Sequence, residues 1–152
     1  MIAVADCGIG IPEHLLRRYT DASDYDSEVI ALALKPGITG VLPGAYGTPD
    51  NAGAGLFITR CIAKGSGGYF FVASGHGAYR LRRARNPDEQ TELFEDPLED
   101  RHDLWDFNHR WNGTVVALEI RTDQIADFEG YFSWIRRHFS SRRATRRRIK
   151  FT

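Results

Sequence analysis

Two short glycine-rich segments hold the residues of this sequence that are best suited to binding a phosphate group. The first, residues 6–11, reads Asp-Cys-Gly-Ile-Gly-Ile and follows an apolar run. The second, residues 53–57, reads Gly-Ala-Gly-Leu-Phe and opens a run with helical spacing. Glycine lets a ligand approach the backbone closely, and the first N–H groups of a helix have no partner inside it. Such turns therefore predict a phosphate-binding or nucleotide-binding site.

The first segment matches neither of the two commonest phosphate-binding fingerprints. The dinucleotide fingerprint needs a third glycine three residues after the second, where this chain has Glu13. The phosphate-loop pattern needs Gly-Lys followed by Ser or Thr, and this occurs nowhere in the sequence. A different kind of site is therefore indicated.

The first segment needs a strand before it and a helix after it, and the sequence predicts both. Residues 2–6 form an apolar run that ends in an aspartate, which favours a short buried strand. Pro12 suits the first turn of a helix because that position needs no N–H group, and we expect this helix to reach about Tyr19.

A second helix and a long flexible loop are expected next. The helix covers residues 26–35, with Asp26 or Ser27 as its N-cap and Pro36 as its end. Residues 36–55 are rich in glycine and proline, and a long loop of this composition is typical of a lid over a ligand.

The rest of the chain is predicted from periodicity and turn residues. In order, the elements are a helix over 56–65, a hairpin of strands 69–73 and 78–82 turning at 74–77, a strand over 113–120 and a helix over 125–138. Residues 84–110 are polar and mostly acidic, and we interpret them as a solvated insertion.

The order of these features resembles the GHKL superfamily of ATP-binding domains, which share the Bergerat fold. The pattern is Asp6-x-Gly8-x-Gly10-Ile11, then the lid, then Gly53-x-Gly55-Leu56-Phe57 opening a helix, and finally Gly113-Thr114 at the start of a strand. The histidine-kinase type is the nearest likeness, and it implies an ATP-binding domain of signal transduction. The likeness covers roughly residues 2–121.

The resemblance implies a role for each matching residue at the base end of the ligand. Asp6 would accept a hydrogen bond from the adenine amino group, a polar contact that a wrong base would leave unpaired. Gly8 and Gly10 would let the backbone lie against base and sugar, and Ile11 would supply an apolar wall. Thr114 resembles the family's threonine that binds the adenine, often through water.

At the phosphate end, the resemblance implies contacts from the second glycine segment and the lid. Gly53, Gly55, Leu56 and Phe57 open the helix whose N–H groups would receive the phosphates. Lys35 is a candidate phosphate contact because it is the single cation at that end of the loop.

The sequence departs from the family ahead of Asp6. Family members carry there a long helix with an Asn that binds Mg²⁺ and a Glu that activates the attacking group, and this sequence begins too close to Asp6 to include it. We therefore expect ATP binding, name no catalytic residue, assign no metal ligand, and leave enzymatic activity open. A protein partner or a missing N-terminal segment would have to supply those groups.

Plainer readings of the same residues stay open. Asp6 and its glycines can form a strand-ending turn that caps a helix, and the second glycine segment can be an ordinary start of a helix. Thr114 is as well explained as a β-branched strand residue. A non-catalytic module that keeps the fold and binds another protein is the alternative function.

Composition bounds the class of protein and its partners. The 20 Lys and Arg balance the 20 Asp and Glu of the 152 residues, so net charge indicates no partner. Residues 136–150 are rich in arginine, which we interpret as a solubilising tail rather than a nucleic-acid site. Two cysteines make no disulfide framework, and the apolar start is too short for a signal peptide or a membrane span. We expect a cytoplasmic protein.

Together these observations predict a two-layer α/β sandwich of the Bergerat type, truncated at its N-terminus, with a mostly antiparallel sheet and helices on one face. Residues 1–122 would form the ATP-binding domain, and residues 123–152 a C-terminal helix with a basic tail.

Overall fold

The computed structural model describes residues 1–39, 53–124, 127 and 129–137. A three-stranded antiparallel sheet lies at its centre, in the order β1-β3-β2. The strands are β1 (Ile2–Ala5), β2 (Tyr69–Leu81) and β3 (His102–Glu119). The helices are α1 (Ile11–Leu16), α2 (Asp26–Ala33), α3 (Gly55–Gly65), α4 (Pro87–Thr91), a 3-10 turn (Thr122–Gln124) and a last helix over residues 129–137. The chain is therefore of the mixed α/β class, as predicted.

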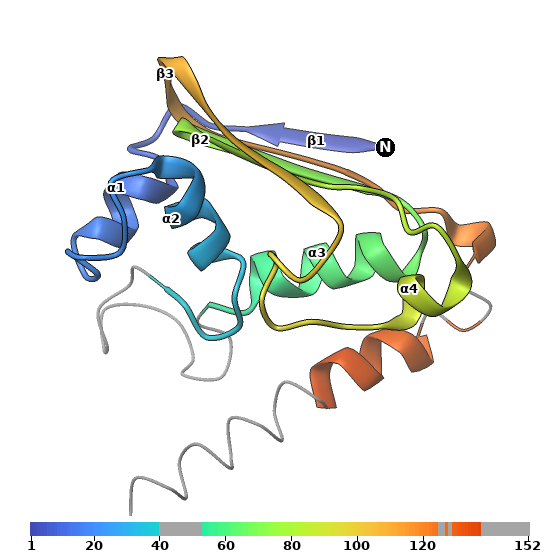
Figure 1. Cartoon of the computed structure of the whole chain (residues 1–152). Helices are drawn as coiled ribbons and strands as arrows, with labels where there is room; N and C mark the ends of the chain where they lie inside the picture. Colours follow the sequence, from blue (N-terminus) through green and yellow to red (C-terminus); the bar gives the residue numbers. More distant parts are fainter. Residues whose placement is uncertain (40–52, 125–126, 128, 138–152) are drawn as a thin grey trace, which may run out of the picture.

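The helices lie on one face of the sheet (Figure 1). The main core forms where β2 meets α2 and α3, and its fully buried members are Ile30, Leu34, Ala63, Phe70, Val72, Tyr79 and Leu81. Alternate residues of a strand point to opposite faces, and accordingly Phe70 and Val72 enter this core before the bulge of β2, and Tyr79 and Leu81 after it. Val116 and Leu118 of β3 pack against it from the same face.

β2 is one long strand, and the predicted hairpin turn at residues 74–77 is wrong. Its first half pairs with the end of β3, with Ser74 opposite Thr114, and its second half pairs with the start of β3, with Leu81 opposite His102. Between these halves the register shifts at Gly75 and Gly77, and residues 107–110 of β3 protrude with no strand-pairing partner on β2. The glycines that indicated a turn instead accommodate a bulge in a continuous strand.

β1 is confirmed as a strand, but the expectation that it is buried is wrong. All four of its residues are exposed, and Ile2 and Val4 are 61% and 66% exposed. β1 is an edge strand, and its side chains Ile2 and Val4 lie opposite Leu118 and Val116 beyond the area that the described helices cover.

The two helices after the first glycine segment are shorter than predicted. α1 ends at Leu16 and α2 at Ala33. Neither Asp26 nor Ser27 caps α2, because Tyr25 occupies the N-cap position without a side-chain hydrogen bond. The Asp26 carboxylate instead accepts the backbone N–H of His76, and the Ser27 hydroxyl donates to Asp106. Both side chains thus connect α2 to the bulge of the sheet.

The acidic insertion is not the solvated loop that its composition predicts. Its last residues form the start of β3, and Asp100 is buried against α3. The Asp100 carboxylate accepts hydrogen bonds from Arg60 and Lys64, and the Tyr79 hydroxyl donates to the carbonyl of Pro97 at 3.0 Å. The segment between α4 and β3, residues 92–101, is therefore held to the core, and we call it the strap.

The last helix packs on α3. Ile135 is buried with Phe57 and Cys61, and the Tyr131 hydroxyl donates to the carbonyl of Cys61 at 2.9 Å. Most of the predicted lid and the basic tail, residues 40–52 and 138–152, lie outside the described residues.

Candidate nucleotide-binding site

The first glycine segment and the Gly-Thr pair meet at one end of the sheet. The pairing of β1 with β3 continues one residue beyond the strand, because the Asp6 N–H donates to the carbonyl of Thr114 at 2.9 Å. Residues far apart in the sequence thereby become neighbours. The fold brings together the residues that the resemblance assigns to the base end of the ligand.

One oxygen of the Asp6 carboxylate is held by the backbone. Oδ1 accepts the N–H of Gly8 at 2.8 Å and the N–H of Thr114 at 3.2 Å. Among the described residues no hydrogen bond reaches the other oxygen, Oδ2. Asp6 is exposed rather than buried as the sequence suggested, because it follows an uncovered edge strand. The carboxylate is thus oriented through one oxygen and leaves the other to accept a donor.

Ser74 of β2 joins three segments at this place. Its hydroxyl accepts the N–H of Ile11 at 2.8 Å and donates to the carbonyl of Gly113 at 2.7 Å. It also lies 3.1 Å from the hydroxyl of Thr114. Ser74 itself is 0% exposed, while its partners Ile11 and Thr114 are partly exposed. Sequence reasoning placed this residue in a turn and missed it.

Two glycines are required by the close packing around Ser74. Gly10 and Gly113 have φ values of 83° and 102°, which side chains rarely adopt. A Cβ at Gly10 would lie 2.6 Å from the Ser74 hydroxyl, and one at Gly113 would collide with the Asp6 carbonyl. Gly8 is different, since a Cβ there would meet only the Asp6 carboxylate, at 3.1 Å.

The second glycine segment shapes the base of the predicted lid. The Gly37 N–H donates to the carbonyl of Gly53 at 3.0 Å, and a Cβ at Gly53 would collide with Ile38. Gly53 therefore closes the base of the loop, while Gly55 begins α3 and has no described atom near the position of a Cβ. Among the described residues, no side chain caps the N-terminus of α3.

The apolar residues beside the two glycine segments, Ile11, Leu56 and Phe57, do not all pack against the same part of the core. Ile11 and Leu56 are half-buried and pack against the same two core clusters, so both segments rest on one core. The Phe57 side chain is buried on the other side of α3, with Cys61 and Ile135. Its predicted contact with a ligand would have to come from the backbone.

Lys35 is held in an ion pair. Its ammonium donates to Asp96 of the strap at 2.6 Å, and the two side chains are 36% and 32% exposed. Partial burial acts to raise the pKa of Asp96, but the hydrogen bonds from Lys35 and the Leu98 N–H, together with the charges of Lys35 and Arg60, outweigh it and lower the pKa. Lys35 would have to leave Asp96 in order to reach a phosphate.

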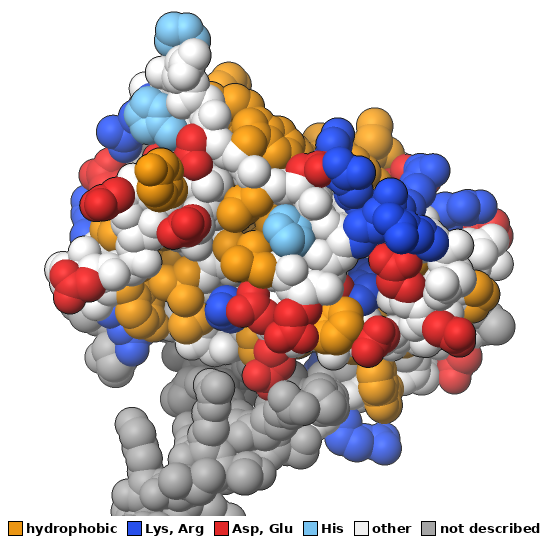
Figure 2. Space-filling model, viewed as in Figure 1, with side chains coloured by type: hydrophobic (Ala, Val, Ile, Leu, Met, Phe, Trp, Pro, Cys, Tyr) orange, Lys and Arg blue, Asp and Glu red, His pale blue; other side chains and the backbone are white. Residues whose placement is uncertain are grey.

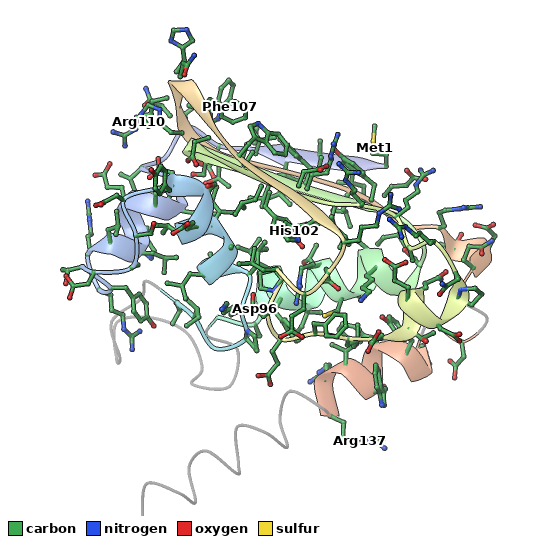
Figure 3. The ribbon with its side chains drawn as sticks, in the orientation of Figure 1. Met1, Asp96, His102, Phe107, Arg110 and Arg137 are labelled. Carbon is green, nitrogen blue, oxygen red and sulfur yellow. The ribbon has the colours of Figure 1, made fainter. Side chains whose placement is uncertain are left out.

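Two cavities of ligand size lie near the bulge of the sheet, and Asp6 lines neither. One, of about 490 Å³, lies between α1 and the bulge and is bordered by Glu13 and Arg110. The other, of about 600 Å³, lies on the sheet beside the protrusion and is bordered by Phe107 and Trp111. Figure 3 shows Phe107 and Arg110 together at this end of the sheet, and Met1 toward the other.

The described part of the chain offers no group of three or more His, Cys, Asp or Glu arranged to hold a metal ion. Its helices include none long and apolar enough to cross a membrane.

Both cysteines are free. Burial raises the pKa of the Cys61 thiol to about 12, whereas Cys7 is exposed beside Asp6.

Comparisons of the chain with protein-family models, with curated proteins and with solved structures find no match. The assignment of the site therefore rests on its residues and their geometry.

Proposed function

We propose that this chain is an ATP-binding domain of the GHKL type, with a Bergerat-type arrangement of its sheet and helices. The observation that carries the proposal is the hydrogen bond between Asp6 and Thr114, which joins the end of β1 to β3. It lies beside Gly10 and Gly113, where a Cβ would collide with neighbouring atoms. The plainer interpretation of Asp6 as a helix cap does not account for this, because the Asp6 carboxylate does not cap α1. The N-cap of α1 is Gly10, without a side-chain hydrogen bond.

In this proposal the Asp6 carboxylate recognises the adenine base through a hydrogen bond. Oδ1 is held by two backbone N–H groups, and Oδ2 accepts the exocyclic amino group. A hydrogen bond to a charged acceptor contributes about 1.5–3 kcal/mol, which corresponds to roughly ten- to a hundredfold in affinity.

The phosphates would lie toward the N-terminus of α3. Within the described part of the chain its first N–H groups have no side-chain cap, and no atom stands where a Cβ of residue 55 would lie. A helix N-terminus favours negative charge through its dipole and its unpaired N–H groups.

Nucleotides of this class are usually bound as magnesium complexes, in which the ion takes most of its ligands from the phosphates and water and one or two from protein groups. The described residues include no group of three or more His, Cys, Asp or Glu that could hold the ion without the nucleotide. We propose ATP binding for this chain and assign it no magnesium ligand and no hydrolysis. A protein partner is proposed as the source of any catalytic group.

The experiment is calorimetry with ATP, with and without Mg²⁺, on the wild type and on Asp6→Asn. Asparagine keeps Oδ1 as an acceptor for Gly8 and Thr114 but replaces Oδ2 with an amide that donates. The fold should survive while affinity for ATP drops about tenfold or more. Asp88→Asn, an exposed carboxylate on α4, is the matched control and should bind as the wild type does. Absence of heat and of any thermal shift at millimolar ATP would remove the proposal.

A non-catalytic interaction module is the alternative, and the outer face of the sheet favours it. Phe107 and Trp111 are 38% and 49% exposed and border the apolar cavity beside the protrusion. Figure 2 shows hydrophobic side chains along the edge of the molecule that the sheet forms. Clustered exposed apolar side chains commonly mark protein-binding surfaces. Under this alternative Trp111→Ala should abolish association with a partner, and Asp6→Asn should leave it unchanged.

A further inference from the structure

The side chains of Asp6, Ser74 and Thr114 lie on the same face of the sheet. Ser74 and Thr114 are directly opposite each other, and each continues the alternation that puts Val72 and Val116 into the core. Asp6 continues the same alternation on β1, two residues after Val4 and bonded to Thr114. Any ligand group that reaches Asp6 from the helix side of the sheet therefore also approaches the Thr114 hydroxyl.

The hydrogen bonds of Ser74 determine the direction of the Thr114 hydroxyl. A hydroxyl has one hydrogen and two lone pairs. The hydrogen of Ser74 goes to the Gly113 carbonyl at 2.7 Å, because a carbonyl can only accept. One lone pair receives the N–H of Ile11 at 2.8 Å. The contact at 3.1 Å with Thr114 can then be satisfied only if Thr114 donates its hydrogen to Ser74.

Because its hydrogen is donated to Ser74, the Thr114 hydroxyl can only accept a hydrogen bond from a ligand. Asp6 Oδ2 is also an acceptor, so the two groups nearest the predicted base both require a donor. An exocyclic amino group, as on C6 of adenine, satisfies acceptors. A carbonyl oxygen at the same position is itself an acceptor, so it cannot form a hydrogen bond with Asp6 Oδ2 or with the Thr114 hydroxyl. Polar groups left unpaired in this way reduce affinity.

We infer that Ser74 is a positioning residue that fixes the Thr114 hydroxyl as an acceptor and so makes the site select a 6-amino purine over a 6-oxo purine. Ser74 acts through Thr114 and the backbone of residues 10–11, and need not touch the nucleotide. This inference rests on the proposed ATP-binding function, and it adds the element that sets base specificity.

The test compares the dissociation constants of ATP and ITP on the wild type and on Ser74→Ala. The two bases differ at position 6 and in the proton that the 6-oxo base carries on N1. The wild type should prefer ATP by about tenfold or more, since a polar mismatch is involved. Without Ser74 the Thr114 hydroxyl can turn and donate to the 6-oxo group. The ATP-to-ITP preference should then fall by about fivefold, the value of one hydrogen bond.

A matched control separates this effect from simple loss of stability. Ser66 is also 0% exposed, and its hydroxyl donates to the carbonyl of Ala63 at 3.0 Å at the other end of α3. Ser66→Ala should lower the melting temperature as Ser74→Ala does, but keep the wild-type ATP-to-ITP preference. A merely structural Ser74 would change the melting temperature and leave the preference as it was.

A second variant keeps the inference testable if Ser74→Ala does not fold. Thr114→Val removes the hydroxyl itself and suits a strand, so it should reduce the preference to a similar degree. The double variant should add no further change, because both substitutions remove the same polarity. Thr114→Ser should retain the preference.

The outcomes are distinct. An unchanged ATP-to-ITP preference in Ser74→Ala or in Thr114→Val, with ATP still bound by the wild type, overturns the role of Ser74 and spares the proposed function. Failure of the wild type to bind either nucleotide overturns the proposed function, and the inference with it.

Discussion

The buried charges between α3 and the strap make a quantitative prediction about stability. Asp100 accepts hydrogen bonds from Arg60 and Lys64, and the three side chains are between 1% and 6% exposed. Arg60 also donates to the carbonyl of Phe94 at 2.5 Å, and its Nε is buried without a hydrogen-bond partner among the described residues. Two buried cations thus depend on a single carboxylate.

Replacing Asp100 by asparagine keeps the shape and removes the charge. Breaking a buried ion pair by removing one partner costs about 3–5 kcal/mol, because the remaining charge is left uncompensated. Domains of this size are stable by about 5–15 kcal/mol, so the loss would be a large part of the total. With a urea slope of about 2 kcal/mol/M, the unfolding midpoint should fall by about 1.5–2.5 M.

Urea unfolding followed by circular dichroism measures the shift, with two reference variants. Asp123→Asn, in the exposed pair with Arg121, should leave the midpoint unchanged. Adding Lys64→Met to Asp100→Asn removes one of the two stranded cations and should recover part of the loss. A midpoint for Asp100→Asn that stays within about 0.5 M of the wild type would refute the reasoning that Asp100 neutralises a buried site.

Three further predictions follow from single groups. Hydrogen bonds from two arginines lower the pKa of Asp103 from 3.8 to about 2. The contribution of Asp103 to stability is therefore complete above about pH 4 and is lost as pH falls toward 2. Acid unfolding of Asp103→Asn should lack this loss of stability between about pH 4 and 2. A thiol reagent should modify exposed Cys7 rapidly in the native protein and reach Cys61 only in urea, as peptide mass spectrometry would show; equal native rates would contradict the burial of Cys61. Gly113→Ala should lower the unfolding free energy by about 3 kcal/mol or more, whereas Gly55→Ala should change it little; equal urea midpoints for the two would contradict the assigned backbone.

The sequence by itself determined the elements whose signals are local. The strand over Ile2–Ala5, the helix over Gly55–Gly65 and the strong strand after Gly113 were predictable, because apolar periodicity and glycine or proline boundaries act within a few residues. The same local rules misplaced a turn within β2, since Ser-Gly-His-Gly has turn composition, but the partner strand allows it to continue through a bulge.

Only the tertiary structure decided which residues meet. The resemblance assigned Asp6 and Thr114 to the same end of the ligand, but their direct contact depends on β1 pairing beside the end of β3. Ser74 gave no signal, because a serine acquires its role from the two segments that pack around it.

Burial was decided in the same way, because it depends on what packs against a residue and not on its type. Asp100 is buried in an acidic segment because two cations of α3 face it. Ile2 and Val4 are apolar and exposed because β1 lies at an edge of the sheet beyond the described helices.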